Sequence, residues 1–247
     1  MDRGLYVAMT GAKQIMQAQA VNNHNIANIS TIGFRADSVN FDSEPIYGPG
    51  FATRVNAVAG DAGTDFSAGT MENTGRDLDI AVNGKGFIAV QGTDGKEAYT
   101  RAGDLRVSPD GAVTTASGLP VLTESGPLVI PPATVVNIGS DGTVSAVPQG
   151  SAPFAITQVD RIKLVNPPTT DLQKGDDGLL RLKAGGKSKT DDSVSVTSGM
   201  LESSNVNAAQ SLISMIELQR MYEFQIKSIN STDTNEQSAE KMMSSSS

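Results

Sequence analysis

The stretch VNNHNIANISTIGFRAD, residues 21–37, decides how the rest of the chain is interpreted. Apolar residues recur at helical spacing before it, and within it four asparagines and one histidine interrupt that pattern. Gly33 then predicts a helix stop, because glycine readily adopts the left-handed conformation that ends helices. A helix that turns polar in this way fits two kinds of site: a catalytic or metal centre, or a polar surface where subunits assemble.

Working outward, the N-terminal segment 3–29 has the period of an amphipathic helix. Its stripe alternates spacings of three and four residues and consists of Leu5, Ala8, Ala12, Ile15, Gln19, Asn22 and Ile26. Met9 and Met16 lie beside this stripe, which becomes polar in its second half. The pattern predicts a helix that buries one face.

The C-terminal end repeats this design. From Asn205 to about Lys241 the sequence contains neither Gly nor Pro, and Ser203, Ser204 or Asn205 would cap the helix start. The predicted stripe is Leu212, Met215, Gln219, Tyr222, Ile226, Ile229, Asp233 and Glu236, widened by Ile213 and Ile216. This stripe also turns polar partway, so both helices need a partner along part of their length.

The middle of the chain has regularly placed turn-forming residues, as expected for antiparallel β structure. Turn dipeptides stand at Asn83-Gly84, Asp94-Gly95, Asp110-Gly111, Asp141-Gly142 and Asp177-Gly178. Short β-prone runs lie between them: LDIAV (78–82), FIAVQ (87–91), EAYTR (97–101), LRVS (105–108), AVTT (112–115), TVVNI (134–138) and RIKLV (161–165).

These patterns predict a mixed, mainly β protein. Discontinuous N- and C-terminal helices form a coiled-coil-like domain, and an antiparallel β domain lies between them in the sequence. The predicted boundaries are 1–33 with 203–247 for the helical assembly domain, 34–69 for an extended or hairpin-like connector, and 70–202 for the β domain.

Composition excludes several classes of function. The net charge of −8, with no cluster of Lys and Arg, argues against nucleic acid as a partner. The absence of cysteine excludes disulfides and thiolate metal sites. No run approaches the roughly 20 apolar residues of a membrane span, so direct membrane insertion is not expected, and the N-terminus lacks the apolar region of a cleavable signal peptide.

Residues with catalytic or metal-binding potential do not form a recognisable site. His24 is the only histidine and has no paired carboxylates nearby in sequence, so we interpret it as a structural polar residue. Asp77 and Asp79 could share a strand face, but strand entry before an Asn-Gly turn explains them better. The GGKS stretch at 185–188 lacks the glycine that a phosphate loop requires, because Arg181 stands there. We therefore predict no enzyme, no metal and no cofactor.

The asparagines of the opening stretch can serve assembly in place of catalysis. Asn22, Asn23, Asn25 and Asn28 carry both hydrogen-bond donors and acceptors. In a tightly packed assembly such groups can set the register between identical or related subunits, as a buried asparagine does in a coiled coil. Asparagines that are merely solvated are the alternative. Their pattern favours an assembly surface over catalysis.

Three motifs resemble one known family. ANISTIGFRAD (27–37) resembles the N-terminal signature of bacterial flagellar rod and hook proteins. RDLDIAVNGKGFIAVQ (76–91) and AYTRAGDLRVSPDG (98–111) resemble that family's β-domain strands. SGMLESSNVNAAQSLISMIELQRMYEFQIKSINSTD (198–233) is similar to its C-terminal signature. The motifs occur in the family's order and span nearly the whole chain.

Within this family, the chain length, the MDRGLYVAM start and the modest connector resemble the proximal rod most closely. The distal rod protein is the alternative, and a hook protein would carry a larger β insertion. The resemblance implies a structural subunit of the basal body, in the rod that crosses the periplasm and transmits motor torque. It implies export through the flagellar type III apparatus, and assembly with other rod subunits and with itself.

For a structural subunit of this kind we predict which residues form the assembly interface. The apolar contacts would be Leu5, Ala12, Ile15, Ile26, Leu212, Met215, Ile216, Tyr222, Ile226 and Ile229. Asn28, Thr31, Gly33 and Phe34 would form the turn into the connector, and Asn205 and Val206 would set the start of the C-terminal helix. A binding module whose helices form a private intramolecular stalk is the competing hypothesis.

Amide hydrogen exchange on the purified monomer separates these two hypotheses. A subunit whose helices order on assembly should exchange rapidly in residues 1–33 and 203–247 and slowly in residues 75–200. Slow exchange at both ends would instead indicate a self-contained helical stalk.

Overall fold

The computed structural model describes residues 3–45, 55–60, 63–150 and 156–245 of the 247-residue chain. The chain forms two compact units, each built from discontinuous segments. The helical unit comprises Met1–Ile29, Ala36–Asp65 and Val206–Ser247, and the β unit comprises Ser30–Arg35 and Phe66–Asn205. A mixed, mainly β fold is confirmed.

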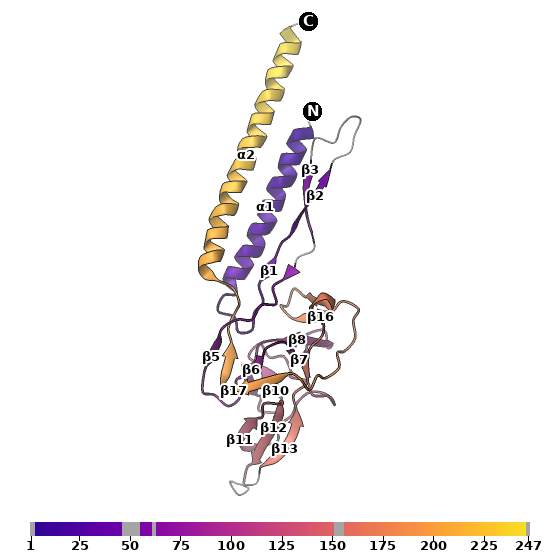
Figure 1. The fold of residues 1–247 in the computed structure, drawn as a ribbon, viewed down its shortest axis with the longest axis vertical. Helices are drawn as coiled ribbons and strands as arrows, with labels where there is room; N and C mark the ends of the chain where they lie inside the picture. Colours follow the sequence, from indigo (N-terminus) through magenta and orange to yellow (C-terminus); the bar gives the residue numbers. More distant parts are fainter. Residues whose placement is uncertain (1–2, 46–54, 61–62, 151–155, 246–247) are drawn as a thin grey trace. The chain divides into compact units, whose positions relative to one another are not determined.

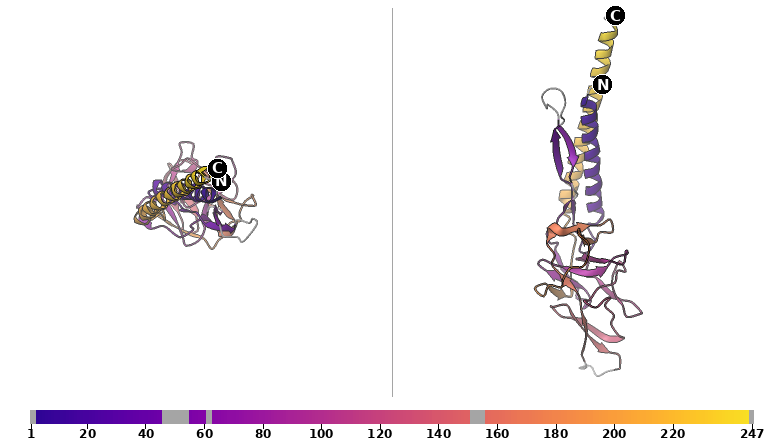
Figure 2. Two further views of the ribbon diagram at one scale, coloured as in Figure 1. Left: turned by 90° about the horizontal axis from the view of Figure 1, so that it is seen from above. Right: turned by 90° about the vertical axis from the view of Figure 1, so that its right-hand side faces the viewer.

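The helical unit contains two long helices, α1 (Arg3–Ala27) and α2 (Ala208–Ser245). They run side by side in opposite directions, α1 in indigo and α2 in orange to yellow (Figures 1 and 2). Both predicted helices are therefore confirmed. Whether they supercoil as a coiled coil stays a prediction.

The segment between α1 and the β unit forms short strands. They are β1 (Asp37–Ser38), β2 (Phe41–Pro45), β3 (Val55–Ala59) and β4 (Gly63–Thr64). β2 pairs with β3 as an antiparallel hairpin, and β1 pairs with β4. The hairpin lies alongside the helices in the right view of Figure 2 and packs on α1 through β3. A hairpin-like form of this segment agrees with the sequence interpretation, whereas its folding as a separate connector stays a prediction.

The start of α2 differs from the prediction. The sequence places the helix cap at Ser203, Ser204 or Asn205, whereas the Asn207 side chain accepts the Gln210 N–H at 3.1 Å and caps the helix. Asn205 is instead engaged within the β unit, where its backbone N–H donates to Phe34 O at 3.3 Å.

The β unit is built from antiparallel ladders throughout its described residues. Its main sheet has the order β14-β7-β8-β16-β15, formed by Leu164–Val165, Phe87–Gln91, Glu97–Thr100, Leu180–Leu182 and Leu172–Lys174. A second sheet has the order β11-β12-β13, formed by Ala133–Ile138, Thr143–Pro148 and Thr157–Arg161.

Three two-stranded ladders and one short helix complete this unit. They are β9 (Leu105–Val107) with β10 (Val113–Thr115), β6 (Ile80–Asn83) with β17 (Ser195–Ser198), β5 (Met71–Asn73) with β18 (Met200–Glu202), and the 3₁₀ helix η1 (Thr169–Asp171). Each predicted β-prone run contributes residues to a strand of the β unit, and RIKLV (161–165) contributes to two, β13 and β14. The last two ladders pair the start of the β unit with its C-terminal end.

Strand β7 shows where the core lies. Ile88 and Val90 belong to the larger buried cluster, and Phe87 and Ala89 belong to a second cluster on the opposite face. Alternate residues of a strand point to opposite faces. The run FIAV is therefore apolar at every position because both faces of the sheet are covered.

The turns follow the predicted glycines. At all five Asn-Gly and Asp-Gly dipeptides the glycine has a positive φ, between 67° and 83°. Two of them differ in their surroundings: a Cβ at Gly111 would lie 2.4 Å from Ile130 O, whereas a Cβ at Gly95 would meet nothing within 4 Å.

This difference gives a matched pair of substitutions. Gly95→Ala should cost about 1–2 kcal/mol of the free energy of unfolding, because alanine is strained in the left-handed region. Gly111→Ala should cost about 3 kcal/mol or more, because its methyl group also displaces a backbone carbonyl. Urea unfolding followed by circular dichroism measures both, and equal losses would contradict this account.

Candidate assembly interface

Two residue pairs fix the register of the helices. The Asn22 Nδ2 atom donates to Ser211 O at 2.9 Å, at the end of α1 and the start of α2. At mid-helix, a Cβ on Gly11 would lie 3.3 Å from Gln225 Cδ, so Gly11 leaves the space that this side chain occupies. The helices are therefore antiparallel, with the C-terminal end of α1 beside the N-terminal end of α2 (Figure 1).

The predicted stripe of α1 is confirmed by burial. Ala8 and Ala12 are buried, and the other stripe residues are half-buried: Leu5, Ile15, Gln19, Asn22 and Ile26. The stripe thus forms the contact face of α1, including the polar positions of its second half. Small alanines allow close approach of the neighbouring backbone.

The contact face of α2 differs from the predicted stripe. Met215, Tyr222 and Ile229 are half-buried as expected, but Leu212, Gln219, Ile226 and Asp233 are exposed. Their places are taken by the half-buried residues Ser211, Leu218, Gln225 and Thr232. The pairing at Gly11 explains this shift, because it accepts the Gln225 side chain where a larger residue would exclude it. Apolar residues cover more than one face of α2, and periodicity alone did not select the correct one.

A set of apolar side chains on the two helices is exposed, and we name it the outer helix surface. It consists of Tyr6, Met9 and Met16 on α1 and Leu212, Ile213, Ile216 and Phe224 on α2. Ile216 is 54% exposed and Phe224 is 71% exposed. Spacings of three, four and eight residues place the α2 members on one side of the helix. Grouped exposed apolar residues of this kind are typical of protein interfaces.

The predicted interface residues occupy three environments. Ala12 and Phe34 are buried, and Thr31, Leu212, Ile216 and Ile226 are exposed. The remainder are half-buried: Leu5, Ile15, Ile26, Asn28, Gly33, Asn205, Val206, Met215, Tyr222 and Ile229. The set is thus divided between contacts within the chain and exposed positions. Its role in assembly stays a prediction.

Most asparagines of the opening stretch form hydrogen bonds within the chain. Buried Asn25 donates from Nδ2 to Asp37 O at 2.7 Å and accepts the Asp37 N–H at 2.9 Å through Oδ1. It therefore binds the backbone of β1 as a neighbouring strand would. Asn22 reaches Ser211 O, and Asn28 Nδ2 donates to His24 O at 2.9 Å, whereas Asn23 is exposed. Three of these four residues thus have intramolecular partners, where register between subunits was the expectation.

The turn after α1 requires glycine. Gly33 has φ +67°, and a Cβ there would lie 2.3 Å from Ala102 N. Its N–H donates to Glu202 O at 2.7 Å. The next residue, Phe34, is buried, with Lys174 Nζ 3.9 Å from its ring centroid. Gly33 and Phe34 were predicted to form this turn.

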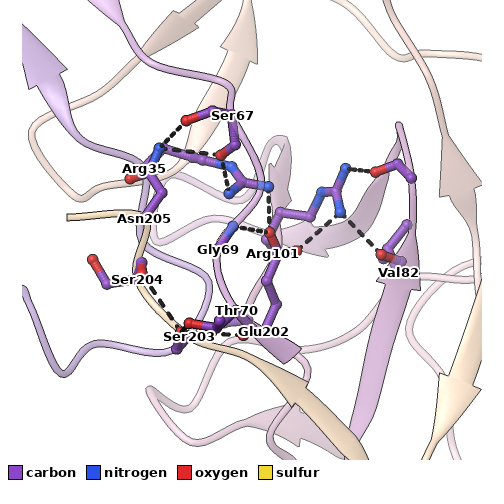
Figure 3. Close-up of polar contacts among 12 residues, drawn as sticks. Arg35, Ser67, Gly69, Thr70, Val82, Arg101, Glu202, Ser203, Ser204 and Asn205 are labelled. Carbon is purple, nitrogen blue, oxygen red and sulfur yellow. Dashed lines mark hydrogen bonds and ion pairs between the residues drawn. The ribbon is translucent and has the colours of Figure 1, made fainter. Parts of the chain in front are cut away.

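Glu202 lies at the centre of a buried ionic cluster (Figure 3). Its side chain is fully buried, and its two carboxylate oxygens accept from Arg35 Nη2 at 2.7 Å and Arg101 Nη1 at 2.9 Å. The Gly69 N–H donates to Glu202 Oε1 at 2.9 Å. Burial of charge is favourable only where such partners are present.

The two arginines extend this cluster into the backbone. Arg35 Nη1 donates to Ser67 O at 2.6 Å, and Arg101 donates to Val82 O at 3.1 Å from Nη1. Arg101 also lies over the Phe87 ring, 5.2 Å from its centroid. Burial lowers the pKa of the Arg101 guanidinium; Glu202 opposes this effect, and Arg35 adds to it.

The local sequence pattern does not reveal this cluster. Glu202, Arg35 and Arg101 each stand inside a quoted motif, but nothing in the local pattern distinguishes them from solvated charges. The available signal was the position of Glu202 directly after Met200 and Leu201 at the end of a β-prone run. That signal is weak, because the partners of Glu202 are distant in sequence.

A second buried pair lies elsewhere in the β unit. Lys163 Nζ donates to Glu97 Oε1 at 2.9 Å and Oε2 at 2.8 Å, and Tyr99 Oη donates to Glu97 Oε1 at 3.0 Å. The Ser188 N–H donates to Tyr99 Oη at 2.8 Å. Burial is the main cause that raises the pKa of Tyr99 to about 12.

The discarded catalytic candidates occupy ordinary structural positions. His24 is exposed, with Nδ1 3.0 Å from Asp37 Oδ2. Asp77 is exposed, and buried Asp79 lies 3.5 Å from Arg76 Nη1. Among the residues that the structure describes, no three His, Asp or Glu side chains gather as metal ligands. Over the same residues, neither helix has the length and apolar character needed to cross a bilayer.

Comparison with known proteins identifies the class. The model of the "Flagellar hook protein FlgE/F/G D1 domain" matches residues 81–146, and that of the "Flagellar basal body rod FlgEFG protein C-terminal" matches residues 197–242. The chain belongs to the flagellar basal-body rod protein family and is a structural subunit of the rod.

Individual relatives refine this result. The chain is 39% identical to the flagellar basal-body rod protein FlgF of Salmonella typhimurium and 40% identical to that of Escherichia coli K12, over 99% of each chain. It is 32% identical to FlgG of Buchnera aphidicola, covering 93% of this chain and 95% of the relative. The two FlgF relatives are the more similar, which supports the expected likeness to the proximal rod.

The pKa of Tyr99 predicts a pH dependence of stability. The unfolded phenol loses its proton near pH 10 and the folded one near pH 12, so stability is complete below pH 10 and falls as the pH rises through this window. Two pH units correspond to about 2–3 kcal/mol. Urea titrations across this range should show the decline in the wild type and a smaller decline in Tyr99→Phe. The same slope in both proteins would contradict the assignment.

Proposed function

We propose that this subunit builds the proximal part of the rod through its terminal helices and there transmits torque from the motor. Its partners are neighbouring rod subunits and other copies of itself. The proposal includes delivery through the flagellar type III export apparatus and a final location in the rod crossing the periplasm. It also treats the chain as a purely structural protein, without catalysis, cofactor or nucleic acid.

The observation that carries this proposal is the outer helix surface. A buried Leu, Ile or Phe side chain contributes about 1.5–3 kcal/mol relative to an exposed one. Leu212, Ile213, Ile216 and Phe224 are half or more exposed, so each retains much of that contribution for a partner. Helix–helix packing against another subunit uses such a surface directly.

The overhang of α2 supports the same proposal. Gly11 lies beside Gln225, so the antiparallel register places Arg3, eight residues before Gly11, near Asp233, eight residues after Gln225. The turns of α2 from Asp233 to Ser245 therefore extend beyond the start of α1 (Figure 1). An isolated polar helical segment of this length is marginal in water, and packing against a neighbouring subunit would stabilise it.

Charge distribution favours contacts between helices of different subunits. The α1 segment contains Arg3 and Lys13 and no acidic residue. The α2 segment contains five acidic and three basic residues. Opposite net charges on the two helices attract, and this attraction guides correct pairing more than it adds affinity.

Charge substitutions on α2 test the proposal. Ile216→Asp and Ile226→Asp place a carboxylate at apolar exposed positions, so the β unit should fold normally while incorporation into the rod falls to background. The measurement is recovery of the chain in purified basal bodies from a strain lacking the native gene, together with swimming.

Ser228→Asp is the matched control, because it adds the same charge at an exposed polar position of the same helix. It should be incorporated like the wild type. Normal incorporation of both isoleucine variants would overturn assembly through the exposed apolar residues of α2.

A further inference from the structure

The chain passes between its two units four times. It enters the β unit after Ile29, leaves it after Arg35, returns after Asp65 and leaves finally after Asn205. Each passage is a covalent connection through which force on one unit reaches the other. The side chains that hold these connections in place therefore matter for a subunit under load.

The Glu202 cluster holds all of these connections within the β unit (Figure 3). The Gly33 N–H binds Glu202 O, and the Arg35 guanidinium binds the Glu202 carboxylate. Gly69 N–H binds the same carboxylate, which ties in the returning segment. Glu202 itself belongs to the departing segment, where Asn205 Nδ2 donates to Ser67 O at 3.1 Å.

Arg101 connects the segments that Glu202 binds to strands β6 and β8. It follows β8 directly, and its guanidinium joins Glu202 to the backbone oxygens of Val82 and Gly84. Tension on the departing segment therefore reaches β6 and the end of β8 through the Arg101 side chain, and it reaches β5 through the β5–β18 ladder.

Burial makes the cluster cooperative. Removal of the Glu202 charge leaves Arg35 and Arg101 buried close together without their carboxylate partner, and like charges in a poorly solvated site repel. Loss of one charged partner consequently weakens the contacts of every segment that the cluster joins. A surface ion pair such as Arg161 with Asp192 would not have this effect.

We propose that Glu202 is a positioning residue for torque transmission: it binds the entering, returning and departing segments together, so that the β unit takes up force through all of them at once. This inference rests on the proposed function. Without Glu202, force would reach the segments one at a time, and hydrogen bonds loaded in sequence yield at lower force than bonds loaded together.

Glu97 supplies the matched control. It is also a buried carboxylate bound by a cation, Lys163, but its side chain binds Lys163 and Tyr99 and not the connecting segments. Glu202→Gln and Glu97→Gln each remove one buried negative charge with little change in shape. A general loss of stability would therefore appear in both variants, and only a positioning role distinguishes them.

The first experiment is amide hydrogen exchange on the purified full-length variants. In Glu202→Gln, residues 30–35, 66–70 and 202–205 should exchange roughly tenfold faster or more, and together, since charged hydrogen bonds are lost at each segment. In Glu97→Gln, the acceleration should be confined to the surroundings of Lys163 and Tyr99. Equal acceleration of the connecting segments in both variants would overturn the inference.

The second experiment measures rotation under load in cells lacking the native gene. Motors with Glu202→Gln should turn normally with a small bead and stop or detach with a large bead, whereas Glu97→Gln should match the wild type at both loads. Wild-type rotation of Glu202→Gln at high load would overturn the inference. If the unmodified chain failed to restore the rod, the proposed function would be wrong, and the exchange experiment would still decide whether Glu202 joins the segments.

Discussion

The pairing of one buried carboxylate with two buried guanidinium groups is the interaction on which the rest of the structure depends. Glu202 lies near the end of the β unit, whereas Arg35 and Arg101 come from its first segment and from the end of β8. None of the three charges is favourable in a dry interior without the others. The chain segments that carry them must therefore come together for the β unit to close.

The two units divide stability and recognition between them. Strand β7 is buried on both faces, so the β unit holds its own core. The helices bury only one face on each other and leave residues such as Ile216 and Phe224 exposed. The β unit thus carries the buried core, and the helices carry the exposed apolar side chains on which the proposed assembly depends.

The sequence predicted what depends on local pattern. The turns require left-handed backbone at the position after Asn or Asp, and glycine occupies that position. Periodicity located both helices, and turn-bounded β-prone runs located most strands. The contact face of α2 could not be predicted, because it depends on which α1 residue leaves space, here Gly11 beside Gln225. The Glu202 cluster also escaped prediction, because its partners are separated from it by more than a hundred residues.

The late position of Glu202 has a consequence for incomplete chains. The strands β17 and β18 also come from this end, and they pair with β6 and β5 near the start of the β unit. A product of premature termination before these strands would lack both the ladders and the carboxylate, and its arginines would have no counter-charge. Such a product could not complete the buried contacts of the β unit, so completion of this unit depends on synthesis of its last strands.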